Sequence, residues 1–244
     1  MSTHPPLPAT PMALDHLVVV AHTLTDGVAW CERTLGVTPG PGGEHPLMGT
    51  HNRLLAIHSD AFPAAYLEII AINSGATRPS STSVRRWFDM DNPELQHAIQ
   101  GNGPQLVHWV ARVPELARSL PGWHALGLEP GTATTLSRQT PSGPLTWQLS
   151  VRPDGQRPLG GCLPTLIQWG NRHPCDHLPP SGVTLQHLYL AHPAQHLLAQ
   201  ALVDRPTAIS LGRAPHPILQ ATLNTPLGTV TLSMPHVPPA AGPN

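Results

Sequence analysis

The chain has 244 residues and a net charge of −1 at pH 7, and only 11% of its residues are charged. Without a basic surface to neutralise phosphates, nucleic acid is a poor partner. No apolar run approaches the roughly 18 residues of a membrane span, and no basic start with an apolar stretch marks a signal peptide. The three cysteines form no CxxC pair, which argues against a cysteine zinc site or a disulfide framework and favours a cytoplasmic protein.

The first segment reads as a strand, a helix and further strands. Residues 1–12 are proline-rich and are expected to be a disordered lead-in. The stretch LDHLVVVAH from Leu14 has the short, β-branched pattern of a strand. The helix that follows has Thr25 and Asp26 as caps and Gly36 as its stop. A glycine turn in GGEHPLMGTHN then leads into two strands, RLLAI and AAYLEIIAI.

A second segment repeats this order after a long polar join. The join mixes serine, proline and charge, and a short helix is expected around Trp87 and Phe88. The stretch LVHWVARVP from Leu106 reads as the strand, and the next helix has Pro114 in its first turn. Three further strands are indicated: TATTLSRQ, LTWQLSV and LPTLIQW.

A third, shorter segment begins with the strand LQHLYLAHP at Leu185 and continues with a helix and three short strands. Because the order strand, helix, strands occurs three times, the sequence predicts an α+β fold built from paired βαβββ modules. The expected domain is 13–174, with module one at about 13–73 and module two at about 104–174. A shorter βαβββ-like unit is expected at 182–236, and a disordered tail at 237–244.

The repeat also places polar residues at related points of the two modules. His16 and His108 lie in the first strand of each module, Glu68 interrupts the apolar last strand of module one, and Gln168 is assigned to the matching place in module two. A lone carboxylate in such a strand is costly to bury unless it is paired or ligates a metal. The four residues suit a divalent ion such as Zn, Ni, Mn or Fe(II). A rim histidine, a paired Glu68 and a Gln168 that only forms hydrogen bonds are the ordinary alternatives.

At these residues the sequence resembles the vicinal-oxygen-chelate superfamily, in particular its glyoxalase-like branch. The resemblance rests on LDHLVVVA, GGEHPLMGTHNRLLAI with YLEIIAI, SRQTPSGPLTWQLS and LPTLIQWGNRHP, and it covers roughly 13–174. It implies two βαβββ modules around a cup-shaped cleft, with metal ligands from the first and last strands of each module. Those places are His16, Glu68, His108 and Gln168. The third unit lies outside this plan and could complete the cleft wall or build a homodimer interface.

The resemblance implies a metal-dependent lyase, isomerase or dioxygenase that acts on a small oxygen-bearing substrate chelated in the cleft. Glu68 would ligate or act as the base, and His51 would act beside it. Contacts with the substrate are expected from five more residues: His45, Asn52, Arg138, Trp147 and Trp169. Gln168 cannot take a proton at neutral pH, which argues against a glyoxalase I reaction. The alternative is a metal-free protein of the same fold that binds or sequesters a flat small molecule.

Overall fold

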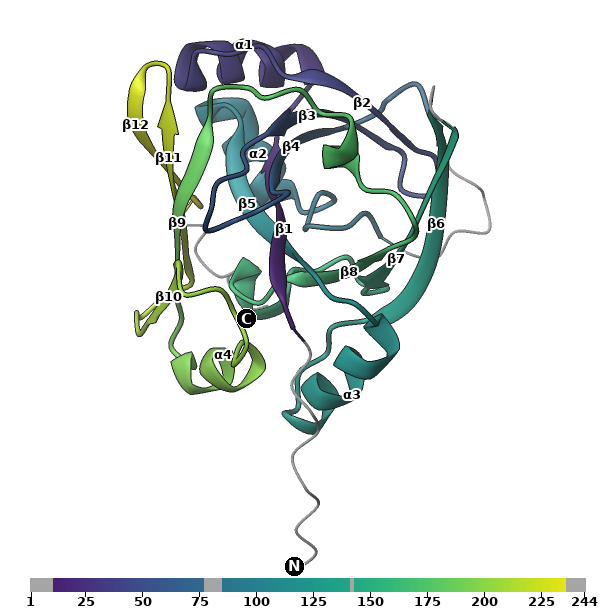
Figure 1. Cartoon of the computed structure of the whole chain (residues 1–244), viewed down its shortest axis with the longest axis vertical. Helices are drawn as coiled ribbons and strands as arrows, with labels where there is room; N and C mark the ends of the chain where they lie inside the picture. Colours follow the sequence, from purple (N-terminus) through teal and green to yellow (C-terminus); the bar gives the residue numbers. More distant parts are fainter. Residues whose placement is uncertain (1–10, 77–84, 141–142, 236–244) are drawn as a thin grey trace, which may run out of the picture.

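The computed structural model describes residues 11–76, 85–140 and 143–235. Within them the chain forms twelve strands and four α-helices, arranged as an eight-stranded sheet, a separate four-stranded sheet and covering helices (Figure 1). The expected tail and most of the expected lead-in lie outside these residues. In the described part of the chain, no helix is both long and apolar enough to cross a membrane.

Module one supplies half of the large sheet. Its elements are β1 (Ala13–Val20), α1 (Leu24–Leu35), β2 (Gly40–His45), β3 (Thr50–Ala56) and β4 (Tyr66–Ile72). Helix α1 ends at Gly36 as predicted, in the left-handed conformation with φ 74°, but its N-cap is Thr23 rather than Thr25 or Asp26. Strand β2 lies where the sequence indicated only a turn, because this edge strand buries few side chains and is held by its pairing with β3.

Module two follows the same plan. Its elements are β5 (Gln105–Arg112), α3 (Leu116–Ala125), β6 (Thr132–Thr140), β7 (Gly143–Val151) and β8 (Thr165–Trp169). The helix in the join is α2 (Pro93–Asn102), which is capped by the side chain of Asn92. Trp87 and Phe88, where a helix was expected, lie in a turn, and both Phe88 and Asp89 adopt the left-handed region at φ 59°.

The two modules join through their first strands. The strand order is β2-β3-β4-β1-β5-β8-β7-β6, with β1 antiparallel to β5 at the centre. In each module the first strand pairs in parallel with the last, β1 with β4 and β5 with β8, so the halves are related by a pseudo-twofold axis. The edge strands β2 and β6 approach each other, and the sheet therefore curls into a nearly closed cup.

The third unit has the predicted order of elements but a different pairing. It consists of β9 (Thr184–Ala191), α4 (Gln195–Ala201), β10 (Ile209–Gly212), β11 (Ile218–Thr225) and β12 (Gly228–Ser233). Here the first strand pairs in parallel with the next one, β10, in the order β10-β9-β11-β12. It is therefore a small sheet of its own and not a third copy of the modules.

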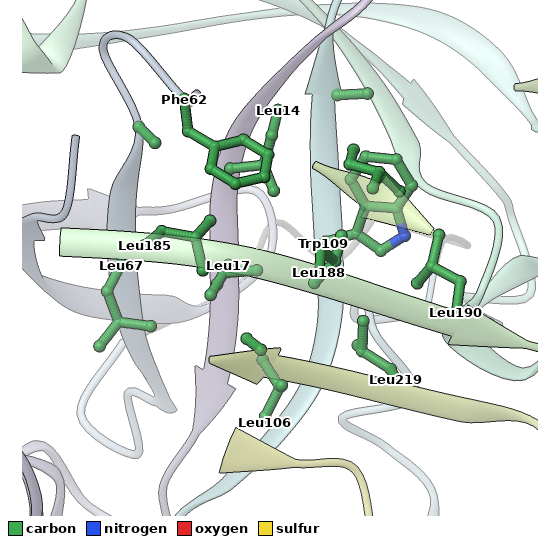
Figure 2. Close-up of a cluster of buried hydrophobic side chains, with 14 of the residues drawn as sticks. Leu14, Leu17, Phe62, Leu67, Leu106, Trp109, Leu185, Leu188, Leu190 and Leu219 are labelled. Atoms are coloured by element: carbon green, nitrogen blue, oxygen red, sulfur yellow. The ribbon is translucent and has the colours of Figure 1, made fainter. Parts of the chain in front are cut away.

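This small sheet covers the outer face of the cup. Strand β9 crosses over β1 and β5, and its Leu185, Leu188 and Leu190 pack against Leu17 and Trp109 (Figure 2). Burying a leucine side chain stabilises a fold by roughly 1.5–3 kcal/mol, so this layer is a major part of the core. Because it lies on the face opposite the cup interior, it does not complete the cleft wall. The inside of the cup remains available for a site.

Candidate functional site

The interior of the cup holds a narrow cleft, with about 450 Å³ between its walls and its open mouth, of which about 40 Å³ is free for the centres of water-sized molecules. Both modules line it, and five aromatic side chains form much of its apolar wall. The aromatic residues are Tyr66, Trp87, Phe88, Trp147 and Trp169. The polar lining residues are His16, His45, Asn52, Glu68 and Arg138. Such a mostly apolar cleft with a few polar groups is typical of small-molecule sites.

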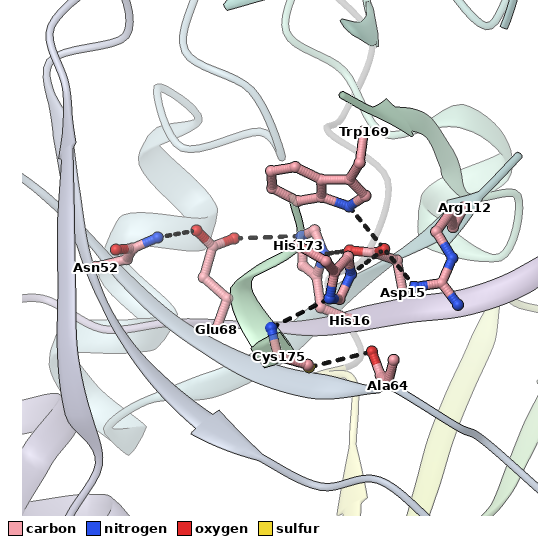
Figure 3. Close-up of polar contacts among 9 residues, drawn as sticks. All are labelled: Asp15, His16, Asn52, Ala64, Glu68, Arg112, Trp169, His173 and Cys175. Carbon is pink, nitrogen blue, oxygen red and sulfur yellow. Dashed lines mark hydrogen bonds and ion pairs between the residues drawn. The ribbon is translucent and has the colours of Figure 1, made fainter. Parts of the chain in front are cut away.

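Glu68 is the buried carboxylate of this cleft, with only 5% of its surface exposed. One carboxylate oxygen, Oε1, accepts a hydrogen bond of 2.5 Å from Asn52 Nδ2 (Figure 3). The amide of Asn52 is itself fixed, because its Oδ1 accepts the Gly43 N–H at 2.7 Å. The second oxygen, Oε2, lies 3.6 Å from His16 Nε2. The carboxylate is therefore held through one oxygen and presents the other to the cleft beside an imidazole.

His16 is oriented by a buried aspartate. Its Nδ1 lies 2.7 Å from Asp15 Oδ1, while Asp15 Oδ2 accepts from Trp169 Nε1 at 2.9 Å and from His173 Nε2 at 3.0 Å. Burial alone would raise the pKa of Asp15, but the hydrogen bonds from His16 and His173 outweigh it and hold that pKa well below the usual range. Asp15 is thus ionised and accepts a hydrogen bond from the Nδ1–H group of His16. This bond orients the imidazole so that Nε2 points into the cleft.

The facing pair of His16 and Glu68 defines what the site can do. If Nδ1 carries the proton donated to Asp15, a neutral His16 presents the lone pair of Nε2 to a carboxylate oxygen. Two acceptors 3.6 Å apart repel each other unless a proton or a cation lies between them. A carboxylate and an imidazole that face each other across a cleft can take a proton from, and return it to, a molecule bound between them.

Asp15 and His173 were absent from the sequence-based list of site residues. Strand β1 is irregular between Leu14 and His16, where Asp15 is the extra residue of a β-bulge against β5. A bulge breaks the alternation of faces along a strand. The side chains of two consecutive residues, here Asp15 and His16, can then lie on the same side and form a hydrogen bond. In the sequence, Asp15 could have been recognised by its place directly before His16 in an otherwise apolar strand. Nothing in the sequence linked His173, which lies in a distant proline-rich loop.

The second module carries the same geometry with different chemistry. Val18 in β1 pairs with Glu68, and the equivalent Val110 in β5 pairs with Thr165. Thr165, not Gln168, is therefore the counterpart of Glu68. His108 is fully buried, and its Nε2 lies 3.0 Å from Thr165 Oγ1 and accepts the Thr165 N–H at 3.1 Å.

This second half-site is also covered. The ring of Phe88, held in its left-handed turn, lies 5.2 Å from the ring of His108. Val107 stands where module one has Asp15, so no carboxylate lies beside the other nitrogen of His108. Burial, together with the charge of Arg157, lowers the pKa of His108 well below its usual value. His108 is thus a neutral core residue whose Nε2 is already engaged.

Gln168 lies on the opposite face of the sheet from the cleft. Ile167 and Trp169 line the cleft, and strand alternation points the residue between them outward. Its Oε1 accepts the Leu116 N–H at 2.7 Å, at the start of α3. The N-cap Glu115 offers this helix no side-chain cap, so Gln168 serves as the acceptor instead. The assignment of Gln168 as a metal ligand does not agree with this position.

The four residues expected to hold a divalent ion are accordingly not brought together. His16 and Glu68 face each other, whereas His108 and Gln168 are engaged elsewhere. Across the described ranges, no cluster of three or more histidine, cysteine, aspartate or glutamate side chains is arranged to hold a metal. These residues do not fit the four-ligand set that the sequence suggested.

The remaining expected site residues divide between two faces. His45, Asn52, Arg138, Trp147 and Trp169 all line the cleft. Burial and the charge of Arg138 lower the pKa of His45 to about 3, so its imidazole is neutral. His51, expected to be catalytic, is not a lining residue, because it neighbours Asn52 in β3 and points to the other face.

Comparisons with known proteins agree with this architecture. Residues 14–205 match the family described as glyoxalase-like domain. No curated protein matches the chain. A hypothetical protein from Staphylococcus aureus has a similar structure, with a TM-score of 0.55 and 11% identity, over 84% of this chain and 88% of that one. This likeness shows a shared fold.

Two methylmalonyl-CoA epimerases are more distant. The protein from Streptomyces coelicolor, in complex with 2-nitronate-propionyl-CoA, has a TM-score of 0.40 and 13% identity, over 68% of this chain and 99% of that one. The protein from Mycobacterium tuberculosis has a TM-score of 0.37 and 15% identity, over 64% of this chain and 86% of that one.

Proposed function

The chain belongs to the glyoxalase-like domain family, and we propose that it catalyses proton transfer at a carbon next to a carbonyl group, as an isomerase or a lyase. The observation that carries this proposal is the position of Glu68. Its buried carboxylate is fixed by Asn52 through Oε1 and faces His16 and the cleft through Oε2. A positioned carboxylate with one free oxygen is a suitable general base.

In the proposed reaction, Oε2 of Glu68 takes a proton from the carbon beside the substrate carbonyl. The C–H bond breaks, an O–H bond forms, and the electron pair moves onto the carbonyl oxygen as an enolate. His16 Nε2, 3.6 Å from this oxygen, is the acceptor that faces the proton held by Glu68. Arg138 offers a positive charge in the same cleft for the developing negative charge. Return of the proton to another position gives an isomer, and loss of a leaving group gives an unsaturated product.

The divalent ion suggested by the sequence has an incomplete ligand set in the described residues. The proposed reaction therefore uses the acid–base groups of the chain. Binding of an ion by His16 and Glu68 alone stays a proposal, and elemental analysis of the purified protein, of His16→Ala and of Glu68→Ala tests it. Stoichiometric metal that is lost in both variants would support it, and metal kept by both would place the ion elsewhere.

Exchange of substrate hydrogen with solvent tests the proposed reaction without knowledge of the product. Small 2-oxo acids and hydroxyketones are incubated with the protein in D₂O, and loss of the C–H signal is followed by proton NMR. We expect wild-type protein to accelerate exchange for at least one compound, and Glu68→Gln to lower that rate by at least about 100-fold. Glu44→Gln, an exposed change on β2, is the control. Equal rates for Glu68→Gln and wild type would refute the proposal.

The second candidate is a protein that binds a flat molecule without turnover. It is favoured by the three tryptophans of the cleft wall, Trp87, Trp147 and Trp169. In that case a ligand of the cleft would bind equally to wild type and Glu68→Gln, and no compound of the panel would exchange with solvent.

A further inference from the structure

Arg138 is partly buried, and two of its three side-chain nitrogens are shielded from solvent without an acceptor among the described residues. These two atoms are Nε and Nη1. Leaving donors of a charged group unpaired is costly in a folded protein. The same side chain lines the cleft. A ligand with acceptor oxygens would supply the missing partners.

The position of this guanidinium depends on a glycine across the opening of the cup. Arg138 extends from edge strand β6, and Gly43 lies in the opposite edge strand, β2. A methyl group on Gly43 would overlap Nη1 of Arg138, so the guanidinium occupies the space that a side chain would fill. The N–H of Gly43 is bound by Asn52, which also holds Glu68. The guanidinium thus lies against the same glycine whose N–H fixes Asn52 and, through Asn52, Glu68.

The surroundings of Arg138 are flat and apolar. The ring centroids of Trp147 and Trp169 lie 5.5 Å apart, and those of His45 and Trp87 lie 5.1 Å apart with the two rings nearly perpendicular. Leu149 and Ile167 provide aliphatic surface in the same cleft. Aromatic walls of this kind favour a planar ligand body. A single cation in such walls favours an anionic end on that ligand.

We propose that the ligand of this cleft is a small planar carboxylate. Its carboxylate accepts hydrogen bonds from the Arg138 guanidinium, and its unsaturated or aromatic body lies along Trp147 and Trp169. This inference names the substrate class of the proposed function and rests on it for the role of Glu68, but the binding itself can be tested separately.

The test compares carboxylates with neutral amides of the same shape. Benzoate, phenylacetate and cinnamate are titrated against benzamide, phenylacetamide and cinnamamide, with quenching of tryptophan fluorescence as the readout. We expect wild-type protein to bind at least one carboxylate about ten- to a hundred-fold more tightly than its amide. Arg138→Met should abolish this preference, whereas Arg118→Met, an exposed change on α3, should keep it.

A second variant moves the guanidinium without removing its charge. Gly43→Ala should displace Arg138 and lower the preference for the carboxylate, but less than Arg138→Met does, because the flexible side chain keeps its charge and can shift. Gly40→Ala in the same strand is the matched control, because its added methyl would make an ordinary contact at 3.4 Å from the Leu54 carbonyl oxygen. Thermal melting identifies any variant that fails to fold.

The outcomes separate the two proposals. No preference for any carboxylate in wild type, or a preference that persists in Arg138→Met, would overturn the carboxylate subsite. Glu68→Gln should keep the preference while losing solvent exchange. A preference without exchange in wild type would leave the subsite standing and refute the proposed chemistry.

Discussion

Glu68 on β4 and Thr165 on β8 occupy the same register position in the two modules. The bulges in β1 and β5 are equivalent as well. Module one fills the three related places with Asp15, His16 and Glu68, and module two fills them with Val107, His108 and Thr165. Asp15, His16 and Glu68 therefore all come from module one, while module two supplies Arg138, Trp147 and Trp169 to the cleft.

The buried His108 should make stability depend on pH. Its pKa is well below the usual value of 6.5 in the folded protein, so only the unfolded chain takes up this proton as the pH falls below about 6.5. The contribution of His108 is thus complete above pH 6.5 and is lost on acidification, by up to about 1.4 kcal/mol per pH unit. His108→Gln should remove this part of the slope, measured by urea unfolding between pH 7.5 and 5.

An exposed histidine provides the comparison. His58→Gln should leave the slope of stability against pH as in wild type. If His108→Gln were as sensitive to acid as wild type and His58→Gln, the imidazole of His108 would not be held neutral in the core.

Gln168 should act on helix α3 and not on the cleft. Gln168→Ala removes the acceptor of the Leu116 N–H, and loss of a helix cap typically costs about 1 kcal/mol. Gln168→Glu keeps an acceptor and adds a negative charge at the helix N-terminus, so it should retain the stability. Chemical unfolding measures both. A loss of ligand binding in Gln168→Ala at unchanged stability would contradict this role.

Asn52 should position Glu68. Asn52→Leu removes the hydrogen bond to Oε1, and hydrogen bonds to charged groups are worth about 1.5–3 kcal/mol. The solvent-exchange rate at saturating substrate should therefore fall about ten- to a hundred-fold, with a smaller change in the substrate concentration needed for half-saturation. His51→Gln changes the neighbouring residue on the other face and should leave both quantities unchanged. Equal losses in the two variants would argue for a general effect on β3.

The small C-terminal sheet should be required for a stable cup. Leu188 of β9 is fully buried against the outer face of the cup. Leu188→Ala should therefore lower the free energy of unfolding by about 2–5 kcal/mol. Val203 is 67% exposed, and Val203→Ala should change the free energy of unfolding by less than about 0.5 kcal/mol. A single unfolding transition that shifts in Leu188→Ala would show that both sheets unfold together. Two separate transitions would contradict a shared core.

The sequence was sufficient for the α+β fold, since the repeated order of strand, helix and strands is a local pattern. It also drew attention to His16 and Glu68, which line the cleft, because a histidine and a carboxylate interrupt otherwise apolar strands. It failed where strands must be aligned with each other. Gln168 was matched to Glu68 by its place in the last strand, whereas the register selects Thr165, and register depends on contacts between distant segments.

Alternation of faces explains two further differences. His51 and Asn52 are neighbours in one strand, so only one of them can point into the cleft. Asp15 joins His16 only because a bulge breaks that alternation. Trp87 and Phe88 reach the cleft from a turn with left-handed backbone, which the sequence of the join did not indicate.

A crystal structure of the Glu68→Gln variant with the tightest-binding carboxylate tests the central claim most directly. We expect the carboxylate at about 2.7–2.9 Å from the Arg138 guanidinium. A carbon next to the ligand's carbonyl or carboxylate should lie roughly 3–3.5 Å from the side chain at position 68. A ligand bound instead in the open groove beside Arg112 and Arg172, with the cleft empty, would contradict this account.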